Sequence, residues 1–298
     1  MRQPIRLSEY TPPSHLIDRV DLTFRLDPRR TRVTAKIRFR PNPARPGADL
    51  RLDGEGLKLI SATIDGAPVT SVPDSTGLTL PASDLPDRPF DWQSEVEIDP
   101  QANTALEGLY ISKGMYCTQC EAEGFRRITF YPDRPDVMAP FRVRIEADLP
   151  VLLSNGNPTG HGAGWAEWDD PHPKPAYLFA LVAGELVATR DRFTTRSGRA
   201  VELAIWVRPG DEGKTAYAMD ALKRSMAWDE RVYGREYDLD IFNIVAVDDF
   251  NMGAMENKGL NIFNSRYVLA SPEIATDEDY ASIERTIAPE PFHNSPAT

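Results

Sequence analysis

A strict alternation of apolar and polar residues near the N-terminus limits the fold most strongly. Residues 20–26 place Val, Leu, Phe and Leu at every second position, and residues 33–39 repeat the pattern with Val, Ala, Ile and Phe. Successive side chains of a strand point to opposite faces, so each segment has one apolar and one polar face. Two such segments joined by the short turn at residues 27–30 predict antiparallel strands over a core.

The rest of the first half continues in the same way. Short strands are predicted at residues 57–64, 78–80, 96–98 and 141–147, and Asp65-Gly66 is a strong two-residue hairpin signal. The three prolines of residues 169–175 require extended backbone, because each fixes its own φ and restricts its predecessor. Residues 177–183 are apolar throughout and predict one further strand. Short strands separated by turns favour a sandwich or an open, saddle-like sheet.

The pattern changes after the short polar segment at residues 191–199. A strand is predicted at residues 201–207, a helix at 215–233 that Gly234 ends, a strand at 239–247 and a helix at 277–288. Strand, helix, strand, helix is typical of an α/β domain. We therefore expect residues 1–190 to form an all-β domain and residues 191–298 an α/β domain that is incomplete.

Charge and composition narrow the function classes. The 298 residues carry a net charge of -11 with a pI near 5.0, which argues against a nucleic-acid partner. No run of roughly 18 apolar residues occurs, so no membrane span and no membrane partner are expected. The polar start lacks the apolar stretch of a signal peptide. Cys117 and Cys120 are too few for a disulfide framework, so a cytoplasmic location is expected.

One loop combines small residues with a single carboxylate directly after the predicted strand 239–247. It consists of Gly253, Ala254, Met255, Glu256 and Asn257. Small residues let a ligand backbone approach closely, and a carboxylate there can hold an ammonium group. The residues alone favour a simpler interpretation, a turn with a solvated glutamate.

Longer stretches around this loop indicate a family. Gly-Ala-Met-Glu-Asn at 253–257 is the exopeptidase signature of the zinc aminopeptidases, and residues 103–110, 117–126, 171–184, 193–199 and 237–267 also resemble that family. The similarity is greatest to its bacterial aminopeptidase N branch and covers nearly the whole chain. The resemblance implies a saddle-like N-terminal β domain followed by the start of a thermolysin-like catalytic domain.

The resemblance also implies roles for the substrate-binding residues. Glu256 and Glu121 are expected to hold the free α-amine of a peptide, and Gln119 to contact its first residue. Gly253 and Ala254 are expected to lie along the substrate backbone, with Met255 and Asn257 completing the substrate-binding segment. A free α-amine has a pKa of about 7.7–8.0 and is mostly protonated at neutral pH, so carboxylates suit it. The implied partners are peptides with a free N-terminus.

The implied cofactor is one Zn²⁺ bound by His-Glu-x-x-His on a helix, but this chain departs from that pattern. Glu290 matches the general base and His293 the second ligand, whereas Pro289 replaces the first ligand and has no ligating atom. A helix-interior proline costs ~3 kcal/mol or more, so Pro289 and Pro291 are expected to prevent a regular helix. The glutamate that would be the third ligand is absent. We therefore expect a fragment that holds no catalytic zinc and is inactive as a peptidase.

Three alternatives remain at this point. The chain could be a non-catalytic module that captures peptide N-termini through Glu121 and Glu256 without metal. The epoxide-hydrolysing leukotriene branch of the same superfamily is the weakest, because residues 253–257 are intact. The C-x-x-C of Cys117 and Cys120 could be a redox pair or half of a zinc site. Free thiols beside substrate-binding residues are the interpretation that we favour.

Overall fold

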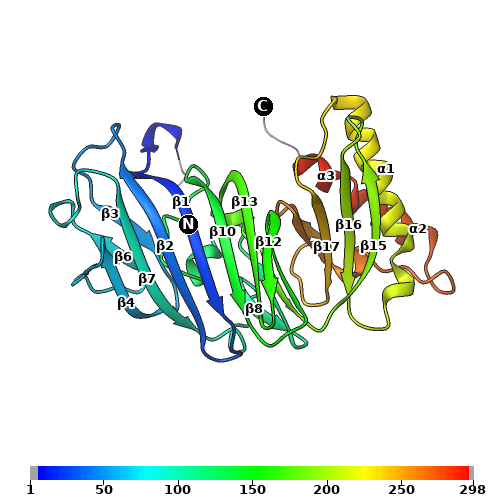
Figure 1. Cartoon of the computed structure of the whole chain (residues 1–298), viewed down its shortest axis with the longest axis horizontal. Coiled ribbons are helices and arrows are strands. Elements are labelled where there is room, and N and C mark those ends of the chain that lie inside the picture. Colours follow the sequence, from blue (N-terminus) through cyan, green and yellow to red (C-terminus); the bar gives the residue numbers. More distant parts are fainter. Residues whose placement is uncertain (1–5, 295–298) are drawn as a thin grey trace.

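The computed structural model describes residues 6–294, and its first part is built almost entirely from strands (Figure 1). An eight-stranded sheet has the order β12-β13-β10-β1-β2-β7-β4-β5, and a four-stranded sheet has the order β11-β14-β9-β8. The large sheet comprises β1 (His15–Arg25), β2 (Thr31–Pro41), β4 (Lys58–Ile64), β5 (Ala67–Pro68), β7 (Phe90–Ile98), β10 (Met138–Glu146), β12 (Asn157–Gly162) and β13 (Trp165–Pro175). The smaller sheet comprises β8 (Gly108–Ser112), β9 (Met115–Gln119), β11 (Val151–Ser154) and β14 (Leu181–Gly184), and β3 (Leu50–Asp53) pairs with β6 (Gly77–Leu80).

The predicted alternations lie at the centre of the large sheet. β1 pairs antiparallel with β2, with Val20 opposite Ile37, and parallel with β10, with Val20 opposite Phe141. All three of these side chains are buried. Residues from both sheets meet in one core, where the Phe125 ring lies 5.0 Å from the Tyr131 ring and 5.3 Å from the Phe179 ring. The apolar face expected from the sequence is therefore the face that forms this core.

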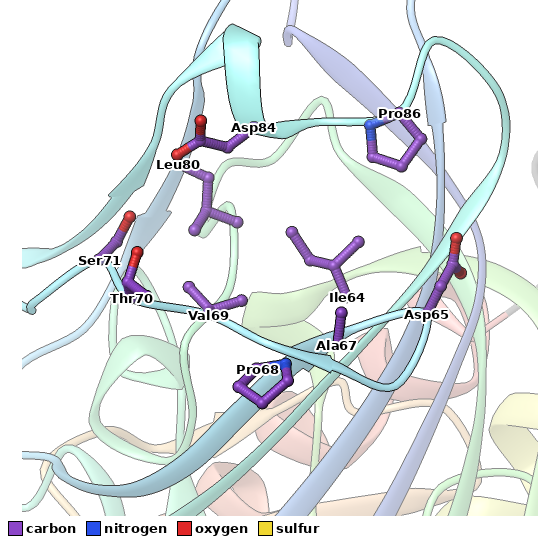
Figure 2. A pocket seen from close by; sticks show the side chains of 10 residues that line it. All are labelled: Ile64, Asp65, Ala67, Pro68, Val69, Thr70, Ser71, Leu80, Asp84 and Pro86. Carbon is purple, nitrogen blue, oxygen red and sulfur yellow. The ribbon is translucent and has the colours of Figure 1, made fainter.

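The hairpin between β4 and β5 forms at Asp65-Gly66, as predicted. Both residues have positive φ, 47° and 82°, which a tight two-residue turn requires. Figure 2 shows a pocket beside this hairpin, where the side chains of Ile64, Val69 and Leu80 surround an open space. No residue of the sequence-predicted site lines this pocket.

The second part is a five-stranded sheet with helices on one face. Its order is β15-β16-β17-β19-β18, and the central pairs β16–β17 and β17–β19 are parallel. In Figure 1, α1 (Ala216–Tyr233) and α2 (Asp277–Ile287) lie on the side of this sheet that faces away from the large sheet. The elements are β15 (Val187–Thr194), β16 (Ala200–Val207), α1 (Ala216–Tyr233), β17 (Ile241–Val247), β18 (Ala254–Met255), β19 (Leu260–Asn264), α2 (Asp277–Ile287) and α3 (Pro289–His293). The expected fold class, a β-rich part followed by an α/β part, is confirmed.

β17 belongs to two cores at once. Ile241, Val245 and Val247 pack with the core of the β-rich part, whereas Phe242 and Ile244 pack under α1 and α2. Every residue of β17 is buried, as expected for a central parallel strand covered on both faces. The five-stranded sheet therefore joins the β-rich part to the helical layer.

The helices have the ends that their sequences favour. Gly234 ends α1 in the left-handed conformation, with φ 68°, and its N–H bonds the carbonyl of Glu230. A capping box between Thr276 and Asp279 begins α2. Within residues 6–294, no helix is long and apolar enough to cross a membrane.

The link between the two parts differs in detail from the sequence prediction. The strand predicted over residues 177–183 is wrong in its first half: Ala176–Leu178 form a 3-10 turn, and β14 begins at Leu181. Here the Asn155 side chain donates to the Leu178 carbonyl and accepts from the Ala180 N–H, which replaces strand pairing. The division near residue 190 stays a prediction. β15 crosses that point, so we propose the boundary between β14 and β15.

Candidate functional site

The loop predicted to bind substrate lies between β17 and β19 and carries the edge strand of the second sheet. Ala254 and Met255 form β18, which pairs antiparallel with Phe263 and Ile262 of β19. The N–H of Asn264 donates to the carbonyl of Gly253 at 2.9 Å. β18 lies at the end of the strand order, so its other edge has no strand beside it in this sheet. A free edge of this kind can accept an added strand.

The β-rich part holds this loop from two sides. Upstream, Tyr110 Oη donates to the carbonyl of Asp249 at 2.8 Å, and Ser112 Oγ donates to its carboxylate at 2.7 Å. The amide nitrogen of Gln119 contacts the sulfur of Met252. Downstream, Asn257 Nδ2 donates to the carbonyl of Leu178 at 3.1 Å. The predicted residues Gln119 and Asn257 are thus part of the junction between the two halves of the chain.

Three predicted carboxyl groups converge at this junction although they are far apart in sequence. Burial, and then the charge of Glu256, raises the pKa of Glu121. The same two causes, in the same order, raise the pKa of Glu290 to about 8. Glu290 is 7% exposed, and its Oε2 has no hydrogen-bond partner in the part of the chain that the structure describes. Buried carboxyl groups beside a further carboxylate form a site that a cation would stabilise.

The last segment that the structure describes, α3, is helical, which corrects the expectation about its prolines. α3 follows α2 directly, with Ala288 in helical conformation between them. Pro289 is the first residue of α3 and Pro291 the third, and N–H groups of a first helical turn need no intrahelical acceptor. The prolines therefore divide the helix at residue 288 but do not prevent the turn that carries Glu290 and His293.

The metal-binding residues do not come together. Across residues 6–294, no group of three or more His, Cys, Asp or Glu side chains is placed to hold a metal ion. His293 is exposed, and Pro289, at the first ligand position, has no donor atom. A catalytic zinc site needs three protein ligands and a water molecule. The residues present do not fit a zinc ion.

Cys117 and Cys120 are free thiols, as we favoured, and both are fully buried. Burial is the main cause that raises the pKa of both thiols, that of Cys117 to about 12. Buried thiols with a raised pKa are not reactive nucleophiles. They support the strand that leads to Gln119 and Glu121.

Sequence reasoning missed several residues that the fold brings to the site. Burial, and then the charges of Glu256 and Glu121, raises the pKa of Tyr177, so its hydroxyl lies within their electrostatic reach. Met252 contacts Gln119, and Lys258 and Asn294 hydrogen-bond to each other. Three of these residues directly adjoin the predicted motifs in the sequence: Met252, Lys258 and Asn294. This adjacency in sequence is the one signal that could have identified them.

Two protein-family models together match most of the chain. The Peptidase M1 N-terminal domain matches residues 15–178, and the Peptidase family M1 domain matches residues 217–295. This chain belongs to the peptidase M1 family. The family resemblance seen in the sequence is therefore confirmed.

Relatives and a solved structure agree with this assignment. The chain is 54% identical to Aminopeptidase N of Caulobacter vibrioides, over 98% of this chain and 34% of that protein. It is also 54% identical to Aminopeptidase N of Escherichia coli, over 96% of this chain and 33% of that protein. A crystal structure of Legionella pneumophila aminopeptidase A in complex with aspartic acid matches with a TM-score of 0.89 and 34% identity, over 97% of this chain and 35% of that one. The chain thus spans about a third of the length of these proteins.

Proposed function

We propose that this chain supplies the part of a zinc-dependent aminopeptidase that recognises the substrate's N-terminus. The observation that carries the proposal is the convergence of Glu121, from the β-rich part, with Glu256 and Glu290, from the α/β part. The names of the relatives, aminopeptidase N and aminopeptidase A, support the same activity. The complete enzyme would remove N-terminal residues from peptides, and its bound zinc would polarise the scissile carbonyl.

The residues of this chain have defined parts in that proposal. Glu121 and Glu256 hold the substrate's α-ammonium by charge-assisted hydrogen bonds. An internal peptide bond has no such ammonium, so cleavage is restricted to the N-terminal residue. The free edge of β18 takes the substrate backbone as an added strand. Glu290, whose pKa is raised to about 8, takes up and releases a proton near neutral pH, as a general base must.

For the chain as given, we propose that it holds no catalytic zinc and does not hydrolyse peptides. His293 is a single candidate ligand, and Glu121 and Glu256 are committed to the amine. Histidine at position 289 is expected to be insufficient, because a third ligand is still lacking. A non-catalytic module that captures peptide N-termini is the second candidate function, and Pro289 at the first ligand position favours it. The buried free thiols support a reducing compartment, and we propose the cytoplasm.

The test is calorimetric titration of residues 1–298 with L-leucinamide, a minimal ligand with a free α-amine. Glu256→Gln is expected to weaken binding by ~1.5–3 kcal/mol, the contribution of a hydrogen bond to a charged group. Glu123→Gln is the matched control, because the Glu123 side chain is 68% exposed and pairs with Arg126. Equal affinities for the Glu256→Gln and Glu123→Gln variants would contradict the amine role.

Zinc content and turnover decide between the two candidate functions. Elemental analysis and an aminoacyl chromogenic substrate are applied to the same preparation. Amine binding without zinc or turnover is expected for residues 1–298. Stoichiometric zinc with turnover would show that the placement of the metal site at His293 is wrong.

A further inference from the structure

The last described residue, Asn294, connects the helix of Glu290 to the loop of Glu256. Its side chain is 1% exposed, and Nδ2 donates to the carbonyl of Glu290 at 2.9 Å and to Asn261 Oδ1 at 2.8 Å. Nδ2 also lies 3.4 Å from the backbone carbonyl of Glu256. The side-chain oxygen accepts from the N–H of Gly259 at 3.0 Å. One buried amide therefore bonds both segments that carry carboxyl groups of the site.

Lys258 joins the same two segments from the other direction. Its ammonium donates to the backbone carbonyl of Asn294 at 3.0 Å and pairs with Asp238 at 2.8 Å. A cation at the carbonyl end of a helix is favourable, and the pairing with Asp238 satisfies its charge. The Lys258 backbone is fixed too, because its carbonyl accepts from Asn155 Nδ2 at 3.1 Å and from the Gly156 N–H at 3.3 Å. Lys258 thus links α3 to the β-rich part.

The bonds made by Asn294 and Lys258 are needed because the carboxyl groups of Glu256 and Glu290 repel each other. Burial is the main cause that raises the pKa of Glu290, and the charge of Glu256 is the second, which means that the two carboxylates also oppose close approach. Burial of Glu290 with an unpartnered Oε2 adds a desolvation cost. Both costs would fall if α3 moved outward and Glu290 became hydrated. Specific bonds must therefore hold α3 against the loop.

We propose that Asn294 and Lys258 are positioning residues that lock α3 onto the 256–261 segment and so fix the spacing of Glu256 and Glu290. This proposal rests on the amine-binding function proposed above. Neither residue is assigned a contact with substrate. They act on the relative positions of the Glu256 and Glu290 carboxyl groups.

The first test is amide hydrogen exchange by mass spectrometry on residues 1–298. Asn294→Ala is expected to speed exchange about tenfold or more in residues 256–261 and 288–294, because it removes buried hydrogen bonds from both. Exchange in β1 and β2 is expected to be unchanged. Asn42→Ala is the matched control, since Asn42 is also buried and bonds the carbonyl of Pro13 and the N–H of Ala44 within the β-rich part. If Asn294→Ala leaves these two segments as protected as Asn42→Ala does, the proposal is overturned.

The second test uses Lys258, whose replacement removes fewer side-chain hydrogen bonds and is expected to keep the fold. Lys258→Met is expected to speed exchange in residues 288–294 and to weaken L-leucinamide binding several-fold, while Lys258→Arg restores both. A role in packing alone predicts that Met, which fills the same space, behaves like the parent, and that result would overturn the proposal. If the parent itself binds no L-leucinamide, the proposed function fails, and the exchange data still decide whether α3 is locked.

Discussion

The two halves of the chain contain buried charged groups that differ in whether they have a partner. In the β-rich part, Asp170 and Lys174 form an ion pair at 3.0 Å with both side chains buried, and the Lys174 ammonium lies 4.1 Å from the centre of the Phe141 ring. In the α/β part, both oxygens of Asp229 and one of Glu290 are buried without a hydrogen-bond partner within residues 6–294. Buried charges are normally paired, so these carboxyl groups carry a desolvation cost that the Asp170–Lys174 pair offsets by its ion pair.

Exposed aromatic side chains gather on one face of the α/β part. Trp228, Tyr233 and Phe292 are each more than two-fifths exposed, and they line one pocket of 690 Å³ between α1 and α3. Asp229 lines the same pocket. Clustered exposed aromatic groups of this kind mark surfaces that other atoms normally cover. The helical face therefore gathers exposed aromatic groups and a buried, unpartnered carboxyl group around one pocket.

The largest expected effect tests whether the β-rich core carries the stability. Phe141→Ala removes a fully buried ring and is expected to cost about 3–5 kcal/mol of unfolding free energy. Phe292→Ala removes a 44% exposed ring and is expected to change stability by less than about 0.5 kcal/mol. Urea unfolding measures both, and comparable losses would remove the contrast between the two regions.

The Phe292→Ala variant sharpens the comparison when a hydrophobic dye is added. Residues 1–298 are expected to bind the dye or to aggregate, and Phe292→Ala is expected to reduce that binding. Val72→Ser is the control, because Val72 is 85% exposed but lies away from the α1–α3 pocket residues. A monodisperse protein that binds no dye would contradict an uncovered helical face.

An effect of opposite sign in the two regions is expected from neutralising one buried carboxylate in each. Asp170→Asn leaves the Lys174 charge unpaired and is expected to destabilise by about 3–5 kcal/mol. Burial raises the pKa of Asp229 to about 6, so the folded chain retains a proton that the unfolded chain has lost. The stability from protonated Asp229 is complete below its ordinary pKa of about 3.9 and is lost as the pH rises through 6.

Asp229→Asn is therefore expected to stabilise the chain at pH 8, on the order of 1 kcal/mol, and to have little effect at pH 4. Thermal melts at the two pH values measure the difference. A loss of stability at pH 8 would show that Asp229 has a partner, and the two regions would then be alike.

The smallest expected effect concerns the loop at the junction of the two regions. A Cβ added at Gly253 would meet no atom closer than 3.5 Å, and the φ of Gly253 is not positive. Gly253→Ala is therefore expected to change the melting temperature by less than about 2 °C. Its effect should appear instead as weaker L-leucinamide binding, if the loop lies along the ligand. A large fall in melting temperature would mean that Gly253 has a structural role.

The sequence predicts the local elements well, because their signals are local. Alternation at residues 20–26 and 33–39 and the Asp65-Gly66 turn identify strands and a hairpin without reference to the rest of the chain. The parallel pairing of β1 with β10 has no such signal, since Val20 and Phe141 meet across 121 positions. The exact start of β14 also depended on a distant side chain, that of Asn155.

The candidate site was only partly predictable for the same reason. Family resemblance names Glu121, Glu256 and Glu290 one by one. The burial of Glu290 and its approach to Glu256, which together raise the pKa of Glu290, require the folded chain. The helical turn of α3 was misjudged, because a proline penalty for helix interiors was applied to a first turn. Asn294 has an amide side chain that could equally be exposed, and its burial is visible only in three dimensions.

The double role of β17 has a consequence for how this protein can vary in length. Alternate residues of the strand belong to different cores. A single residue inserted before Phe242 would therefore turn Phe242 and Ile244 towards the β-rich part and Val245 towards the helices. Both halves would then be mispacked by one change. Insertions and deletions in natural variants should therefore fall in the loops on either side of this strand and never within it.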